Sequence, residues 1–387
     1  MSVVFWLSLA AIGFTYAGYP VLMAALARWR PLPLHWQAQT PAMDVVLVVH
    51  GGADALAAKL ENLLALDYPA DALTIHVFCD GCPASAAVAQ RHASARIKVT
   101  VFPQRRGKSA CLGDALPTLS APLVMFNDVR QRTDAGAAKA LAAALADPTV
   151  GAASGELVLQ ADSGFGQGVD AYWRYEKFIR RMESRSGSIV GVTGAIYAAR
   201  RELIPTVPAG LILDDMWIPL AIAQRGARVV FVSDALAFDR ASADAAAEQR
   251  RKRRTLAGNF QLIHRQPALA IPGAHPLAWR LWGHKWSRLL APWLLLLALL
   301  GNLWLAIAGS AFYQALLALQ LVAYLAAWLG LRRPALASRH AAVRLASAFV
   351  SLNASAMWAL LDYLRNPQGF LWQTTPIKDV PSRDMPQ

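Results

Sequence analysis

Long apolar segments near both ends constrain this chain most. Residues 2–26 carry no charged side chain, and neither do Leu289–Ala308 and Phe312–Leu329. About 20 apolar residues are enough to cross the hydrocarbon core of a bilayer. The chain is 56% hydrophobic and only 16% charged, which is too apolar for an ordinary soluble protein of this size. We therefore expect a membrane protein that keeps residues 1–30 as an anchor, since the first segment lacks the basic start and clear cleavage site of a signal peptide.

Basic residues beside these segments predict their orientation, because cytoplasmic flanks are enriched in Lys and Arg. Arg28 and Arg30 follow the first segment, and Lys285 and Arg288 precede the second. The expected protein is a multi-pass protein of the inner or plasma membrane with residues 41–262 in the cytoplasm. Residues 263–288 include a tryptophan-rich and basic stretch typical of an interfacial helix.

The segment that ends the apolar part, Ala341–Leu364, is a weaker candidate for a membrane span. Several polar or charged side chains interrupt it, as in helices that pack against other helices. Residues 289–364 therefore hold two or three spans. If Ala341–Leu364 spans the membrane, the tail 365–387 lies outside, and if it lies flat or re-enters, the tail stays inside.

Between the anchor and the later spans, strand-like runs alternate with helix-like runs. This alternation predicts an α/β domain with a mostly parallel sheet, whose ligands bind at the carboxyl ends of the strands. Asp80 and Asp128 each fall at the end of a predicted strand. The predicted strands are Val45–Val49, Leu73–Phe78, Ile97–Phe102 and Pro122–Phe126, and a helix is predicted over Ala53–Leu66.

A pair of adjacent carboxylates, Asp214-Asp215, stands between apolar residues. Such a pair costs free energy if it is buried, so chemistry or a partner is one explanation for it. The other explanation is the start of a helix, where Asp is common as a cap or first-turn residue.

Six motifs in this order resemble the family 2 glycosyltransferases. They are the stretches 59–69, 80–81, 107–110, 126–128, 194–201 and 214–215, which read Lys-Leu-Glu-Asn-Leu-Leu-Ala-Leu-Asp-Tyr-Pro, Asp-Gly, Gly-Lys-Ser-Ala, Phe-Asn-Asp, Gly-Ala-Ile-Tyr-Ala-Ala-Arg-Arg and Asp-Asp. The resemblance covers residues 41–262. With its flanking apolar segments, the chain is similar to the polysaccharide-synthase branch that includes hyaluronan, chitin and cellulose synthases.

The resemblance implies a Rossmann-like GT-A type fold and an inverting transfer, in which an acceptor hydroxyl attacks the anomeric carbon of a nucleotide sugar. Such a reaction needs a carboxylate to take the proton and positive charge at the leaving diphosphate. By position, Asp215 corresponds to the family's catalytic base, and Asp214 would orient or tune it.

The resemblance also implies the residues that bind donor and acceptor. Asp80 would contact the nucleotide, Lys108 would lie near the phosphates, and Asp128 would bind a divalent metal, since Mg²⁺ and Mn²⁺ prefer oxygen ligands. Arg254 is the residue kept from a motif that holds the diphosphate. Backbone of Gly194 and Ala195 would lie beneath the acceptor sugar, where a larger side chain would obstruct approach.

Two departures from the family pattern affect the donor site. Arg130 stands where the second acid of the metal-binding Asp-x-Asp motif is expected, and residues 50–54 replace an early Asn-Glu. A guanidinium cannot ligate a cation, but it binds phosphate in a bidentate manner. Either Arg130 partly replaces the metal, or the metal is held by Asp128 and the phosphates alone.

The expected function is a membrane-bound glycosyltransferase of the hexosyltransferase type in polysaccharide or cell-envelope glycan synthesis. Its expected partners are a nucleotide-sugar donor, a glycan or lipid-linked acceptor and membrane lipids. The net charge of +13 suits anionic lipids and phosphorylated substrates, and we expect no nucleic-acid partner. The alternative is a catalytically degenerate domain that acts as a binding or partner subunit of a synthase complex.

Overall fold

A computed structural model of the chain describes residues 1–160, 167–240 and 245–367. The chain divides into two compact units. One contains a β-sheet and, among the described residues, spans Leu34–Gln160 and Gly191–Arg240. The other is helical and contains, among the described residues, Met1–Pro33, 167–190 and 245–367.

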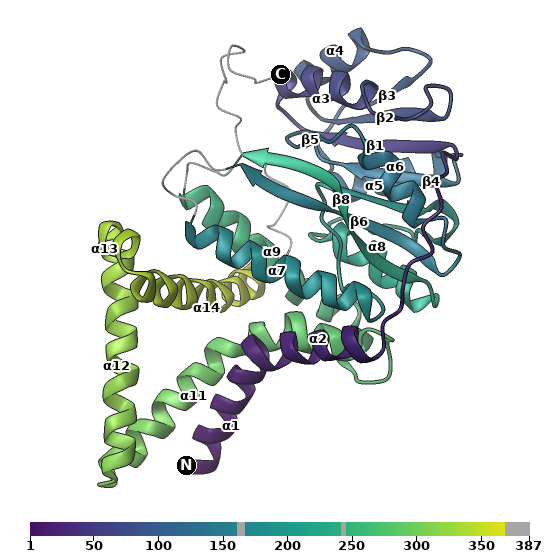
Figure 1. Ribbon diagram of the computed structural model, residues 1–387. Coiled ribbons are helices and arrows are strands. Elements are labelled where there is room, and N and C mark those ends of the chain that lie inside the picture. Colours follow the sequence, from purple (N-terminus) through teal and green to yellow (C-terminus); the bar gives the residue numbers. More distant parts are fainter. Residues whose placement is uncertain (161–166, 241–244, 368–387) are drawn as a thin grey trace. The chain divides into compact units, whose positions relative to one another are not determined.

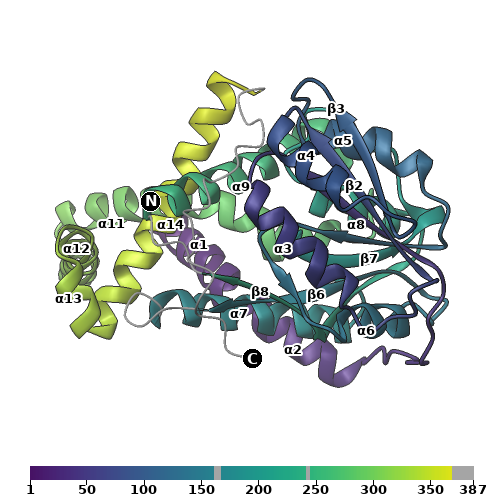
Figure 2. The same cartoon turned by 90° about the horizontal axis from the view of Figure 1, so that it is seen from above.

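The sheet unit is built on one mixed sheet with the strand order β3-β2-β1-β4-β7-β6-β8-β5 (Figures 1 and 2). β1 pairs in parallel with both β2 and β4, whereas β7 runs antiparallel to β4 and β6. The strands are β1 Met43–Val49, β2 Leu73–Asp80, β3 Ile97–Phe102, β4 Leu123–Asn127, β5 Arg132–Thr133, β6 Val150–Gln160, β7 Ile196–Arg200 and β8 Arg228–Arg240. The four predicted strands are present within two residues of their predicted ends.

Every residue of β1 and β4 is buried, so the centre of the sheet is covered on both faces. The α-helices of this unit are α3 Ala53–Leu64, α4 Pro83–Arg91, α5 Lys108–Ala115, α6 Ala137–Ala144 and α8 Asp214–Gln224. The register aligns Val49 of β1 with Cys79 of β2, and Leu47 with Asn127 of β4. The carboxyl ends of β2 and β4 therefore flank the end of β1, and Asp80 and Asp128 stand at these ends.

The helical unit holds four helices that are long and apolar enough to cross a membrane, among the residues that the structure describes: Ser2–Trp29, Ala278–Ile307, Ala311–Arg332 and Ala341–Arg365. The described elements of this unit are α1 Ser2–Gly13, η1 Phe14–Gly18, α2 Tyr19–Trp29, α7 Gln167–Arg185, α9 Ala245–Arg265, η4 Pro267–Ala270, α10 Ala278–Leu281, η5 Trp282–Trp286, α11 Ser287–Ile307, α12 Ala311–Arg332, α13 Pro334–Arg339 and α14 Ala341–Arg365. The predicted interfacial stretch is continuous with the predicted span that follows it, because α10, η5 and α11 form one helix.

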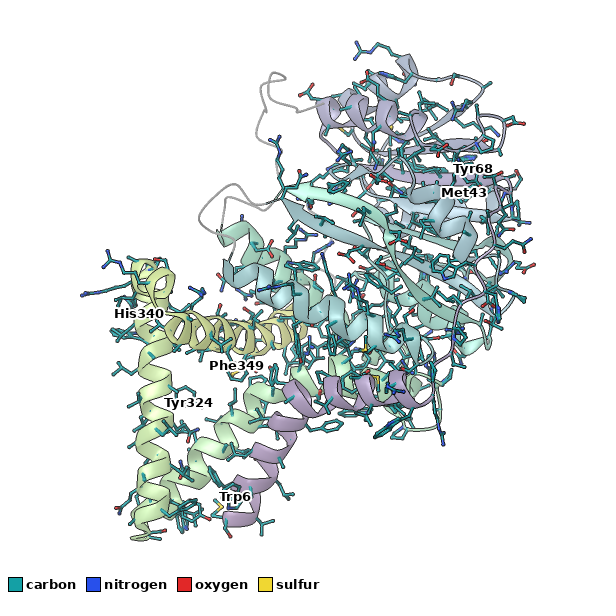
Figure 3. The ribbon with its side chains drawn as sticks, in the orientation of Figure 1. Trp6, Met43, Tyr68, Tyr324, His340 and Phe349 are labelled. Carbon is teal, nitrogen blue, oxygen red and sulfur yellow. The ribbon has the colours of Figure 1, made fainter. Side chains whose placement is uncertain are left out.

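The apolar helices pack against one another through aromatic and small residues. α1 lies beside α11 (Figure 1). Trp6 of α1 (Figure 3) also reaches α12, where its indole Nε1 donates to the hydroxyl of Tyr313 at 3.2 Å. Phe349 of α14 lies edge-on to Tyr16, with ring centroids 5.0 Å apart. Many large apolar side chains on these helices remain exposed, as expected of a surface that faces lipid.

A buried polar network ties α7 to two of these helices. The imidazole of His284 lies 2.9 Å from a carboxylate oxygen of Glu183 and 3.1 Å from one of Glu176. The hydroxyl of Tyr19 donates to Glu183, and a Cβ on Gly283 would lie 2.0 Å from the Tyr19 ring. Both α7 and α9 belong to the helical unit, although they fall inside the predicted domain 41–262. The boundaries of that domain stay a prediction.

Candidate active site

The candidate site lies where several loops of the sheet unit are joined by hydrogen bonds. Asp128 follows β4, Lys108 is the first residue of α5, and Asp214 and Asp215 open α8. The amide of Val192, just before Gly194, donates to the carbonyl oxygen of Asp215 at 3.0 Å. The amide of Leu211 donates to the hydroxyl of Ser109, the neighbour of Lys108, at 3.0 Å. These bonds hold the starts of α5 and α8 and the approach to β7 together.

Lys108 lies between two of the carboxylates. Its ammonium is 3.0 Å from Oδ1 of Asp128 and 3.3 Å from Oδ2 of Asp214, and its side chain is 17% exposed. Oδ2 of Asp214 has no hydrogen-bond partner among the described residues, so its contact with Lys108 is ionic without hydrogen-bond geometry. Burial lowers the pKa of Lys108, but the carboxylates of Asp128, Asp214 and Asp215 outweigh it and hold that pKa above the ordinary value for lysine.

Asp128 and Asp215 face the same small space above Gly194. A Cβ placed on Gly194 would lie 3.7 Å from Oδ2 of Asp215 and 3.8 Å from Oδ2 of Asp128. The next residue, Ala195, is only 4% exposed, so it belongs to the packed floor beneath this space. The structure thus brings Asp128, Asp214, Asp215, Lys108 and Gly194 together, whereas their predicted roles stay predictions.

We expect Gly194→Val to abolish most sugar transfer without unfolding the protein. A Cβ at this position would make ordinary van der Waals contacts, but the two methyl groups of valine would fill the space between the carboxylates. The expected loss in rate is about 100-fold, because reacting groups displaced by about 1 Å lose that much. Thermal unfolding and the initial rate of labelled-sugar transfer measure the two effects. Gly136→Val, on the start of α6, is the matched control, and equal rates in both variants would contradict an acceptor position above Gly194.

Asp80 is fully buried and holds the loop that leads to Lys108. Its two carboxylate oxygens accept hydrogen bonds from the backbone amides of Arg106 at 2.6 Å and Gly107 at 2.8 Å. The loop comes so close that a Cβ on Gly81 would lie 2.3 Å from the amide nitrogen of Arg105, and Gly81 has φ of +60°. Asp80 therefore positions Lys108 through the backbone, and its predicted contact with the nucleotide stays a prediction.

Asp80→Asn is expected to lower both thermal stability and transfer. An amide turns one donor toward a backbone amide that is itself a donor, which leaves a buried N–H group unsatisfied at a cost of about 1–3 kcal/mol. The melting temperature should fall by about 3–6 °C, with a parallel loss of donor affinity as Lys108 shifts. Asp67→Asn is the control, because the Asp67 side chain is 65% exposed in its ion pair with Lys139. Equal melting temperatures for the two variants would contradict the role of Asp80.

Lys59 is the first residue of the motif at 59–69, and the family resemblance assigns it no role. Its ammonium donates to Oδ1 of Asn127 at 2.8 Å, to the carbonyl oxygen of Gln131 at 2.7 Å and to Oγ1 of Thr133 at 2.8 Å. These acceptors bracket the loop that carries Asp128 and Arg130. The sequence does indicate that Lys59 is buried, because it stands at helical spacing from the leucines on the apolar face of α3.

Arg130 is engaged with a carboxylate on the last strand. Its guanidinium lies 3.0 Å from Oδ2 of Asp239, which also accepts a hydrogen bond from the side-chain Nε2 of Gln131 at 2.7 Å. The hypothesis that Arg130 partly replaces a metal stays a prediction, and loss of all transfer with a chelator, restored by Mn²⁺, would contradict it. Arg254 lies on α9 of the helical unit, and its contact with the diphosphate also stays a prediction.

The acids of this site do not form a metal cage. Across residues 1–160, 167–240 and 245–367, no group of three or more His, Cys, Asp or Glu side chains is placed to hold an ion. The ammonium of Lys108 stands beside Asp128, and Arg130 supplies a positive group where the motif's second acid is expected. The residues present therefore do not fit a divalent ion by themselves, and the predicted Mg²⁺ or Mn²⁺ at Asp128 stays a prediction.

The sheet unit has one mixed sheet with acids at the ends of β2 and β4, and comparison with a solved structure identifies its fold as that of a GT-A type glycosyltransferase. The family model described as "Glycosyl transferase family group 2" matches residues 132–331, just over half of the chain. The chain belongs to this family. The predicted family 2 assignment and fold class are thereby confirmed, whereas the polysaccharide-synthase branch stays a prediction.

One solved structure supports the fold, and a second is reported for comparison only. The mannosyltransferase PcManGT from Pyrobaculum calidifontis, in complex with GDP-Man and Mn²⁺, has a TM-score of 0.67 and 23% sequence identity, and covers 92% of this chain and 99% of its own. Mannosyl-3-phosphoglycerate synthase from Rubrobacter xylanophilus has a TM-score of 0.43 and 16% identity over 62% of this chain and 80% of its own. No curated protein matches the chain.

Proposed function

We propose that this protein is a membrane-bound inverting glycosyltransferase that moves a hexose from a nucleotide sugar to a glycan or lipid-linked acceptor in cell-envelope polysaccharide synthesis. The observation that carries the proposal is the shared space above Gly194, which Asp128 and Asp215 both face. Direct displacement at a sugar carbon needs a base on the acceptor side, for which we propose Asp215, and positive charge on the donor side, which Lys108 supplies beside Asp128.

In the proposed reaction, Asp215 accepts the proton of the acceptor hydroxyl as that oxygen forms a bond to the anomeric carbon. The bond from that carbon to the phosphate oxygen breaks, and the nucleoside diphosphate leaves with the electron pair. Lys108 supplies positive charge beside the leaving group, because its ammonium stays protonated among the carboxylates. Asp214 holds Lys108 from the α8 side.

The helical unit supports a membrane-bound enzyme. Four of its helices could span a bilayer, and basic residues flank the first two of them. We place the sheet unit in the cytoplasm, where nucleotide sugars are made, with the protein as a multi-pass protein of the inner or plasma membrane. The proposed domain limits are an anchor at 1–30, a catalytic domain at 41–262 and spans within 289–364.

GDP-mannose is the first donor to test, because PcManGT, which shares the fold, was solved with GDP-Man. Purified full-length protein in detergent is scanned against GDP- and UDP-sugars by thermal shift, since a ligand that binds only the native state raises its melting temperature. Membranes containing the protein then receive each radiolabelled donor that stabilises it. The proposal expects stabilisation by at least one donor and incorporation of its label. Stabilisation without incorporation in any membrane would instead support the degenerate binding subunit.

A further inference from the structure

We propose that Lys59 is a positioning residue of the donor site, which holds the loop bearing Asp128 in place while its amine is protonated and releases it when the proton is lost. The inference rests on the proposed function, since the loop matters as part of a donor site. It predicts that the affinity for the donor falls as pH rises, because Lys59 loses its proton and not because a reacting group titrates.

The position of Lys59 is one where an aliphatic side chain would be expected. It lies on the buried face of α3 with Leu56, Leu60 and Leu63, and it is 3% exposed. Burying an ammonium costs several kcal/mol unless hydrogen bonds or opposite charges compensate it. Among the described residues Lys59 forms no ion pair, and all three of its N–H bonds go to neutral oxygens. Because burying this ammonium without an ion pair costs free energy, Lys59 points to a purpose other than packing.

The three acceptors lie on both sides of the loop. Asn127 precedes Asp128, and Gln131 and Thr133 follow Arg130. The hydroxyl of Thr133 also donates to Oδ1 of Asn127 at 2.6 Å, so the two ends of the loop are joined to each other and to Lys59. The side chain of Asn62 in α3 forms two hydrogen bonds with the Thr133 backbone. Its Oδ1 accepts from the Thr133 amide at 2.8 Å, and its Nδ2 donates to the Thr133 carbonyl oxygen at 2.9 Å. α3 therefore fixes the path of residues 128–130.

Protonation decides whether this arrangement is complete. An ammonium has three donors for three acceptors, whereas a neutral amine has two donors and a lone pair that would face one of the oxygens. Asp128 is the charged group that acts on Lys59 among the described residues, and the acceptors around the amine are neutral. Loss of the proton thus removes one hydrogen bond from the loop and a positive charge from the neighbourhood of Asp128.

The titration falls in an accessible range. Burial lowers the pKa of Lys59 to about 7, although the field of Asp128 acts in the opposite direction. Because this value lies below the ordinary value of 10.5, the unfolded chain binds more protons than the folded chain between about pH 7 and 10.5. Global stability should therefore rise with pH in this window, while the loop at Asp128 loosens. If Lys59 had a purely structural role, the global stability and the order of the loop at Asp128 would change in the same direction with pH.

The test compares wild type with Lys59→Met, which is similar in length and never charged. For wild type, the KM for the donor should rise about tenfold between pH 6 and 9, with a smaller change in kcat, since one lost hydrogen bond is worth about a factor of ten. For Lys59→Met, KM should already be raised at pH 6 and stay flat. Lys139→Met, on α6 in the same unit, is the control and should keep the wild-type profile.

Hydrogen exchange of residues 127–133 gives a second readout that needs no turnover. After correction for the intrinsic rate, exchange in wild type should be faster at pH 9 than at pH 6, and fast at both in Lys59→Met. A pH-independent donor KM in wild type together with unchanged exchange overturns the inference, even if the methionine variant fails to fold. If no nucleotide sugar is turned over, the proposed function fails, and the exchange data alone decide the role of Lys59 in the loop.

Discussion

Asp215→Asn should lower the rate of sugar transfer by about 10²–10⁴-fold, the usual loss when a general base is removed. The amide keeps the size of the side chain but cannot accept the proton of the acceptor hydroxyl. Because Asp215 faces the space above Gly194 together with Asp128, the loss should appear in kcat, while donor binding measured by thermal shift changes little. Initial rates of labelled-sugar transfer in membranes measure the effect.

The control for Asp215→Asn is Asp234→Asn, which changes an exposed aspartate on β8 of the same unit. It should retain the wild-type rate and melting temperature. Equal transfer by wild type and Asp215→Asn would remove Asp215 as the base. It would leave the transfer itself in place, and another carboxylate of the site would then be sought.

Lys108→Met should be the second severe variant, with donor affinity and transfer both lowered by about 10²–10³-fold. The substitution removes the ammonium that lies 3.0 Å from Asp128 and 3.3 Å from Asp214, and leaves their carboxylates to repel a diphosphate. Lys108→Arg should recover part of the affinity, since it restores the charge with a different shape. Lys98→Met, on an exposed position of β3, is the control.

The pH dependence of Lys108 differs in sign from that of Lys59. Carboxylates hold the pKa of Lys108 above the ordinary lysine value despite its burial, so the folded chain binds this proton more tightly than the unfolded chain. Its contribution to stability is therefore complete below about pH 10 and is lost only as pH rises through the raised pKa. If donor affinity still falls near neutral pH in Lys108→Arg, Lys108 is not the source of that fall. If the fall disappears in Lys108→Arg, its assignment to Lys59 is contradicted.

The strands and apolar helices were predictable because their signals are local. Alternating strand-like and helix-like runs placed β1 to β4 within two residues, and hydropathy located the three stronger candidate spans and the weaker fourth, all of which form long apolar helices. Asp80 and Asp128 were correctly placed at strand ends for the same reason. The antiparallel pairing of β7 with β4 and β6 carried no comparable signal, because strand direction depends on which distant strand is the neighbour.

The roles of individual polar residues were harder to predict. Asp80 looked like a group open to a nucleotide, yet both of its oxygens accept backbone amides from the loop before Lys108. Arg130 looked like a phosphate ligand, and its guanidinium pairs with Asp239, more than a hundred residues later. Such partners are fixed by long-range packing, which a motif read along the chain does not contain.

By itself, the sequence determined the family, the α/β class, the apolar helices and the carboxylates at the strand ends, since hydropathy, periodicity and motif order are properties of neighbouring residues. Only the tertiary structure decided which groups meet. It showed that Lys108 stands between Asp128 and Asp214, that Asp215 shares the space above Gly194, and that Lys59 holds the loop of Asp128. The physical reason is that these contacts join loops far apart in the chain, and their distances are set by the register of β1, β2, β4 and β7.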